Sequence, residues 1–91
     1  MKKRDVKSLL GTNIVTWRHR RGITQSFLSE ACGISDVALS RIENGLAWPK
    51  PATLSFLAHS LGVEVHILFL PTSAEKPESF LSVAEKEPEN K

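Results

Sequence analysis

The chain has 91 residues, a formal net charge of +2 and one cysteine. This length holds one small domain, and the 41% hydrophobic and 24% charged content is typical of a globular protein rather than a wholly disordered chain. Because Cys32 is the only cysteine, a disulfide within the chain and a zinc site built from several cysteines are both excluded.

Charge is distributed unevenly along the chain. Residues 1–70 contain nine Lys and Arg against five Asp and Glu, whereas residues 71–91 contain three against five. The sequence therefore predicts a basic folded domain over residues 1–70, including a basic N-terminal arm, and a flexible acidic tail over residues 71–91. A basic excess suits a polyanionic partner, although charge alone does not identify nucleic acid.

The first part of the chain has apolar residues at helical spacing, which predicts two helices. Leu10, Ile14 and Trp17 form the inward stripe of the first helix, which we expect to end near Gly22. Thr24 has the right side chain to cap a second helix, and the glycine of Ala31-Cys32-Gly33 is suited to ending it.

Two further helices are predicted beyond Gly33. Ser35 is suited to capping the third helix, and Gly45 can take the left-handed conformation that closes it. Pro51 is suited to the first position of a fourth helix, which Gly62 ends. The inward residues expected on helices two to four are Leu28, Ala31, Cys32, Ala38, Leu39, Ile42, Leu54, Leu57, Ala58 and Leu61.

Residues 63–70, VEVHILFL, alternate in hydrophobicity and contain several β-branched residues, which predicts a short strand. A short fifth helix is the alternative, because part of the segment also has helical spacing. A single strand leaves its backbone groups unpaired, so we expect it to pair with the same strand of a second subunit in a two-fold dimer. The predicted interface residues are Val63, Val65, Ile67 and Phe69.

The sequence gives little support for catalysis or for a membrane location. It contains no phosphate-binding glycine loop and no nucleophile motif, and its three histidines lack the spacing of metal ligands. We therefore expect no enzyme activity, no cofactor and no metal. The uncharged runs are too short to cross a bilayer, so a cytoplasmic protein is expected.

Residues 10–63 contain several motifs at fixed spacing, among them Thr24-Gln25, Gly33-Ile34-Ser35 and the run from Leu39 to Gly45. In these motifs the segment resembles, without a gap, the lambda repressor and Cro type of helix-turn-helix proteins. The resemblance implies an all-α, four-helix DNA-binding domain, and a dimeric repressor that binds a palindromic site on double-stranded DNA. The residues that carry it are Gly11, Ile14, Arg18, Thr24, Gln25, Leu28, Gly33, Ile34, Ser35, Leu39, Ser40, Arg41, Ile42, Glu43, Asn44, Gly45, Pro49, Leu54, Ala58, Leu61 and Gly62.

The resemblance also implies which residues support the domain on DNA. Arg18 and Glu43 are expected to form a partly buried salt bridge between the first and third helices. At the start of helix two, an amide and the helix N-terminus suit a phosphate oxygen. The residues expected to contact phosphates are Thr24, Gln25, Asn44 and Lys50, of which Lys50 departs from the family by standing where a serine cap is usual.

The third helix is the one that the resemblance places in the major groove. Arg41 has a guanidinium that can donate to guanine O6 and N7 together, and Val37 suits a thymine methyl group. For Asp36 two interpretations are open: it accepts from cytosine N4, or it complements the positive end of the helix dipole. The residues expected to face bases are Ser35, Asp36, Val37, Ser40 and Arg41.

A narrower resemblance is to HipB-type antitoxins, which repress their own operon and bind a kinase-like toxin. It depends on the small size, on Thr24-Gln25-Ser26 at the start of helix two, on the predicted strand and on the tail with its Pro77-Glu78-Ser79. In that tail Phe80, Leu81 and Ala84 have helical spacing, so this patch could fold on a partner. The alternative function is a protein-interaction module that neutralises a partner through the strand and the tail without reading DNA. Binding to random duplex DNA and its salt dependence separate the two.

Overall fold

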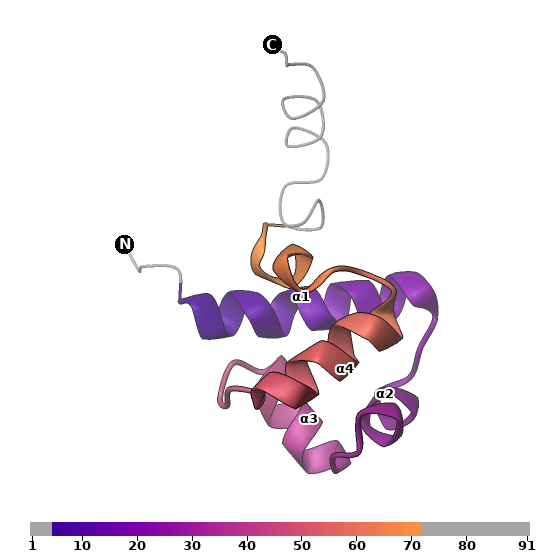
Figure 1. Cartoon of the computed structure of the whole chain (residues 1–91). Coiled ribbons are helices and arrows are strands. Elements are labelled where there is room, and N and C mark those ends of the chain that lie inside the picture. Colours follow the sequence, from indigo (N-terminus) through magenta and orange to yellow (C-terminus); the bar gives the residue numbers. More distant parts are fainter. Residues whose placement is uncertain (1–4, 72–91) are drawn as a thin grey trace.

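The computed structural model describes residues 5–71, which form four α-helices followed by a 3₁₀ helix. The elements are α1 (Val6–Arg21), α2 (Gln25–Cys32), α3 (Asp36–Glu43), α4 (Pro51–Leu61) and η1 (Val65–Phe69). In Figure 1, α2 and α3 lie below α1, α4 runs between α1 and α3, and η1 lies above α1. No strand occurs within residues 5–71, and the predicted four-helix, all-α domain is confirmed.

The ends of the helices follow from the capping residues that the sequence predicts. Thr24 Oγ1 accepts a hydrogen bond from the backbone N–H of Phe27 at 3.0 Å, and Ser35 Oγ accepts one from the backbone N–H of Ala38 at 3.0 Å. Each bond satisfies a donor that the helix itself leaves free, which is worth about 0.5–2 kcal/mol. Between them Gly33 has φ +72°, so the left-handed residue that joins α2 to α3 is a glycine.

The core is a cluster of mostly aliphatic side chains, and each of α1, α2, α3, α4 and η1 contributes at least one leucine or isoleucine. The inward residues predicted for α2 need one correction. Ala31 is exposed, and Ser29 is buried in its place, because the inner face of α2 runs through Leu28, Ser29 and Cys32. The fully buried side chains are Leu10, Ile14, Leu28, Leu39, Leu57, Leu61, Leu68 and Asn13.

The helices α1 and α3 approach each other closely at Gly11. A Cβ atom on this residue would lie 2.5 Å from the backbone oxygens of both Ile42 and Glu43. Real Cβ contacts are never so short, so the backbone of α1 can touch the last turn of α3 only where the side chain is absent. This contact fixes α3 relative to the rest of the domain.

The predicted strand over residues 63–70 is wrong, and the alternative of a short helix is the correct one, in 3₁₀ form. The amide of the buried Asn13 donates to the carbonyl oxygen of Leu68 at 2.8 Å and to that of Leu70 at 2.7 Å. Bonds from Ile67 N–H to Glu64 O and from Leu70 N–H to Ile67 O hold the turn itself. Because α1 satisfies these carbonyl groups and the core takes Leu68, the segment needs no partner strand.

Two expectations lie outside the described residues. These are the basic arm at residues 1–4 and the acidic tail at residues 72–91, including its Phe80, Leu81 and Ala84. Within residues 5–71, none of the helices is both long enough and apolar enough to span a bilayer.

Candidate nucleic-acid interface

One face of the helix α3 is buried in the core, and the opposite face, which we call the open face, is exposed to solvent. Leu39 and Ile42 are buried in the core, whereas Val37 is 70% exposed and Arg41 is exposed. Val37 and Arg41 are four residues apart, so their side chains are neighbours on the outer surface. Ser40, beside them, is half-buried. The structure therefore presents three of the five predicted base-facing side chains together along the outer side of α3.

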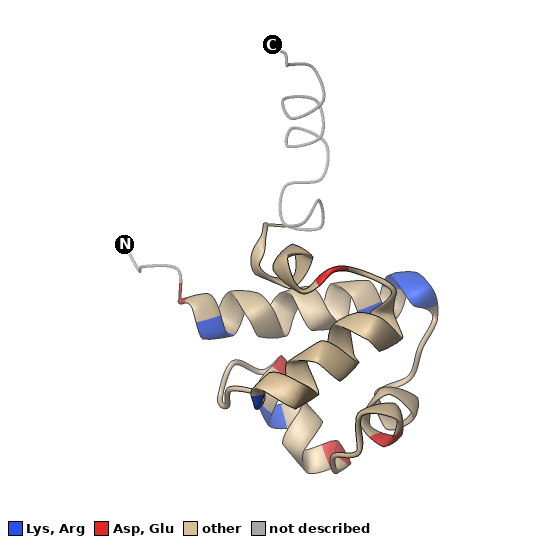
Figure 2. Cartoon of the chain, in the orientation of Figure 1, with Lys and Arg blue, Asp and Glu red and all other residues tan. Residues whose placement is uncertain are grey.

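Charges on α3 are separated along the helix. Figure 2 shows an acidic segment where α3 begins and basic segments toward its far end and at both ends of α1. Asp36 lies in the first turn and Arg41 in the last turn, and a second acidic residue, Glu43, ends the helix and is paired with Arg18. Asp36 and Arg41 each lie at the end of the helix dipole that favours their charge. Arg41 is therefore the cation that α3 itself offers to a polyanion.

The carboxylate of Asp36 faces α2. One of its oxygens accepts a short hydrogen bond from the hydroxyl of Ser29, and the other accepts one from the hydroxyl of Ser26 at 3.2 Å. Ser29 is 3% exposed, so this contact is at the edge of the core. The arrangement matches the interpretation of Asp36 as a residue that completes the start of a helix.

The side chains of Thr24 and Ser35 act as helix caps, as described above. In a cap the hydroxyl oxygen accepts a hydrogen bond, which leaves the hydroxyl hydrogen available to a second partner. Both residues are exposed. Their predicted contacts with a phosphate and with a base are therefore compatible with their structural role.

A buried cluster joins α1, α2 and α3 around Glu43. The expected ion pair is present, with Arg18 Nε donating to Glu43 Oε2 at 2.9 Å and Arg18 Nη2 to Oε1 at 3.2 Å. The two side chains are 12% and 5% exposed. Gln25 Nε2 also donates to Glu43 Oε1 at 2.9 Å, and Arg18 Nη1 donates to the Ile23 carbonyl at 3.2 Å. The sequence indicated the ion pair but not the bond from Gln25.

The bond to Glu43 fixes the direction of the Gln25 amide. A primary amide has two donors, and one of them is used by Glu43. Gln25 is the first residue of α2, where backbone N–H groups are also free. The predicted phosphate contact by Gln25 thus has a positioned side chain and a favourable helix end.

The other two predicted phosphate-binding residues lie after α3. Asn44 Nδ2 donates back to Ser40, with 2.9 Å to the carbonyl oxygen and 3.3 Å to the hydroxyl. The amide of Asn44 therefore closes the end of α3 in this structure. Lys50 is exposed, precedes α4 and makes no side-chain cap bond.

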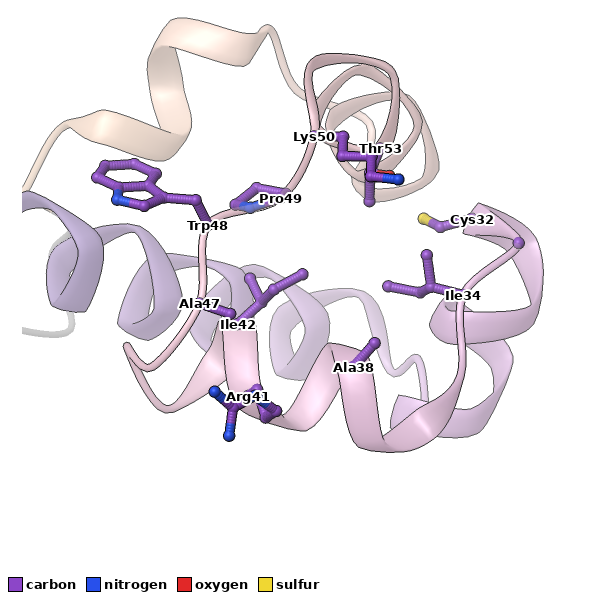
Figure 3. A pocket seen from close by; sticks show the side chains of 11 residues that line it. Cys32, Ile34, Ala38, Arg41, Ile42, Ala47, Trp48, Pro49, Lys50 and Thr53 are labelled. Atoms are coloured by element: carbon purple, nitrogen blue, oxygen red, sulfur yellow. The ribbon is translucent and has the colours of Figure 1, made fainter.

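A groove of about 440 Å³ lies between α3 and the start of α4 (Figure 3). Ile34, Ala38 and Ile42 form its apolar side, and Lys50 and Thr53 lie across from them. Cys32 also lines this groove, and burial raises the pKa of its thiol above the usual 9.0, an effect that a hydrogen bond with Ser60 partly opposes. The Cys32 thiol therefore lines the groove as a neutral group and is not a reactive one.

The residues predicted for a dimer interface do not form one edge. Val63 and Phe69 pack partly against the core, Ile67 is half-buried, and Val65 is exposed. Within residues 5–71, no three His, Cys, Asp or Glu side chains gather in a way that could hold a metal ion.

Comparisons with known proteins agree with this geometry. Residues 14–68 match the helix-turn-helix family. The uncharacterized HTH-type transcriptional regulator y4dJ of Sinorhizobium fredii is 37% identical over 68 residues, which are 75% of this chain and 88% of that protein.

Two solved structures extend the comparison. The clp gene regulator ClgR from C. glutamicum has a TM-score of 0.70 at 26% identity, covering 75% of this chain and 87% of that one. SinR, the master regulator for biofilm formation, solved in complex with DNA, has a TM-score of 0.61 at 33% identity, covering 65% of this chain and 95% of that one. With the family match spanning more than half of its length, the chain belongs to the helix-turn-helix family and is a DNA-binding transcriptional regulator.

Proposed function

We propose that the chain is a dimeric repressor that recognises a palindromic operator by placing α3 in the major groove. The observation that carries this proposal is the open face of α3, on which Val37 and Arg41 project away from a sealed core. A major groove about 12 Å wide admits such a helix. The likeness to SinR, solved in complex with DNA, supports binding of DNA by this fold.

Base reading is assigned to the exposed side of α3. Arg41 donates through its planar guanidinium to guanine O6 and N7, and Val37 packs on a thymine methyl group. Ser40 and Ser35 donate their hydroxyl hydrogens to base edges or to the backbone beside them. One good bidentate pair is worth about 1–3 kcal/mol of discrimination, so Arg41 is the largest single determinant in this proposal.

Phosphate binding is assigned to the ends of the helices around α3. Gln25 offers its second amide hydrogen, and Thr24 offers a hydroxyl, next to the free N–H groups of α2. Lys50 supplies a positive charge, and Asn44 becomes a donor to phosphate if its amide turns away from Ser40. These contacts set the affinity and the salt dependence rather than the sequence preference.

Dimerisation remains part of the proposal, but by a different surface from the predicted strand. Large apolar side chains are exposed at Phe56 on α4 and at Val65 and Leu70 in and after η1. Elements α4 and η1 also pack against each other, so the end of the domain that they form can serve as a two-fold contact. Two copies would then bind half-sites about one helical turn, roughly 34 Å, apart.

The antitoxin function and a kinase-like toxin partner are left out of the proposal. The resemblance to antitoxins depends on a strand at residues 63–70, where the structure has η1, and on the tail, which lies outside the described residues. The alternative function, a protein-interaction module that binds a partner through that strand, is not proposed either, for the same reason.

The test is selection of duplexes from a randomised DNA library with the purified chain, followed by footprinting and sedimentation on the selected site. We expect a palindrome protected on both half-sites, a 2:1 complex, and affinity that falls steeply with salt. A single unpaired half-site would refute the dimer, and a library that emerges unenriched even at low salt would refute sequence-specific binding.

A further inference from the structure

We propose that Asp36 is a positioning residue that sets the angle of α3 on DNA and that it reads no base. The inference deepens the proposed function and rests on it. Although Asp36 precedes Val37 on the recognition helix, its carboxylate bonds to side chains of α2. The hydroxyl groups that donate to this carboxylate belong to Ser26 and Ser29, three positions apart on one face of α2. We call these two hydrogen bonds the Asp36 link.

The two hydroxyls hold the carboxylate from both sides. Ser26 donates to Oδ2, and Ser29 donates to Oδ1. The Ser29 hydroxyl also lies 3.0 Å from the Ser26 carbonyl, but it has one hydrogen, and the charged carboxylate is the stronger acceptor. Ser29 is buried and Asp36 is exposed, so the bond between them is partly buried at the edge of the core, whereas the bond from Ser26 is exposed. The start of α3 is thus attached to α2 at two points.

This attachment matters because readout requires accurate placement of α3. Arg41 is five residues after Asp36, which is about 7.5 Å along a helix. A tilt of about 10° at the start of α3 would move the backbone at Arg41 by more than 1 Å, whereas a working site tolerates roughly 0.5 Å and 10–20°. The contact at Gly11 holds the last turn of α3, so the Asp36 link and that contact fix its two ends.

The orientation of Asp36 also removes a negative charge from the base-reading face. A carboxylate directed at DNA would repel phosphates unless it found a cytosine N4 donor. Here the carboxylate points to hydroxyls that belong to the same domain. The bases are therefore left to Ser35, Val37, Ser40 and Arg41.

The first arm of the test measures base preference on the selected operator and on its single-base variants. Asp36→Asn and Ser29→Ala should each weaken binding to all sequences by a common factor, about two- to tenfold, which is the range of one net hydrogen bond. Asp36→Glu is the matched control for charge: it keeps the anion at the helix start but moves the carboxylate away from the serines. We expect it to behave like Asp36→Asn.

Three outcomes would overturn the positioning role. A variant at Asp36 that relaxes preference at one base pair only, as expected of Arg41→Ala, would make Asp36 a base reader. Full retention of affinity by Asp36→Glu would reduce its role to the helix dipole. Equal affinity of Ser29→Ala and the wild type would show that the serine link is not needed.

The second arm does not depend on DNA, so it separates failure of this inference from failure of the proposed function. Thermal unfolding is measured for Asp36→Ala, which has no acceptor for the serine hydroxyls, for Ser29→Ala and for the double variant. If the link exists, the double variant melts no lower than the worse single variant, because both remove the same bond. If the two reductions in melting temperature simply add, the link is refuted whatever the DNA result. A wild-type chain that selects no DNA would instead refute the proposed function.

Discussion

Replacing Arg18 by methionine is expected to destabilise the domain strongly. The substitution removes both guanidinium donors from Glu43, which is 5% exposed and keeps only the amide of Gln25. Leaving one partner of a buried pair uncompensated costs about 3–5 kcal/mol. A domain the size of residues 5–71 has a total stability of roughly 3–10 kcal/mol, so Arg18→Met removes a large share of it.

Thermal unfolding followed by circular dichroism measures this loss. At about 4–8 °C per kcal/mol for a domain of this size, Arg18→Met should melt at least 12 °C below the wild type. Arg41→Met is the matched control, an exposed arginine whose replacement should change stability by no more than about 0.5 kcal/mol. The double variant Arg18→Met, Glu43→Leu should recover part of the loss, because no buried charge remains.

The reasoning would be refuted if Arg18→Met melted within about 4 °C of the wild type, which is the shift expected of a solvent-exposed pair. It would also be refuted if the double variant were less stable than both single variants. Either result would mean that Glu43 is well solvated without Arg18.

The remaining predictions concern packing and the cysteine. Gly11→Ala should cost about 1–3 kcal/mol, because its Cβ meets the Ile42 and Glu43 carbonyl oxygens, and an unchanged melting temperature would show that α1 and α3 can move apart freely. Cys32 should react with iodoacetamide at pH 8 far more slowly than a free thiol, because burial raises its pKa and keeps it protonated; alkylation at the free-thiol rate would contradict this. Because burial raises the pKa of Cys32, folding favours the protonated thiol, and the contribution of Cys32 to stability is full below pH 9.0 and decreases at higher pH. In a pH series of unfolding curves, Cys32→Ala should remove this decrease.

The sequence predicts the helices well, because their boundaries depend on local chemistry. The caps at Thr24 and Ser35 and the glycine at Gly33 act within a few residues of their own position, so spacing alone locates them. The pair Arg18 and Glu43 is also predicted, but through the family resemblance rather than through spacing.

What the sequence does not predict is long-range side-chain bonding. The bonds of Gln25 to Glu43 and of Asp36 to the serines of α2 join residues whose distance apart depends on how the helices pack. The prediction of a strand at residues 63–70 is wrong for the same reason. Its alternation is real, but Asn13, more than 50 residues earlier, supplies the hydrogen-bond donors that make a 3₁₀ turn stable there.

The most direct test of the account compares Arg41→Ala with Lys50→Ala across the operator and all of its single-base variants. The account predicts that Arg41→Ala costs about 1–3 kcal/mol and loses preference at one base pair in each half-site, whereas Lys50→Ala weakens every sequence alike and lowers the salt slope by about one. If Arg41→Ala kept the full base preference of the wild type, the open face of α3 would not be the surface that reads DNA.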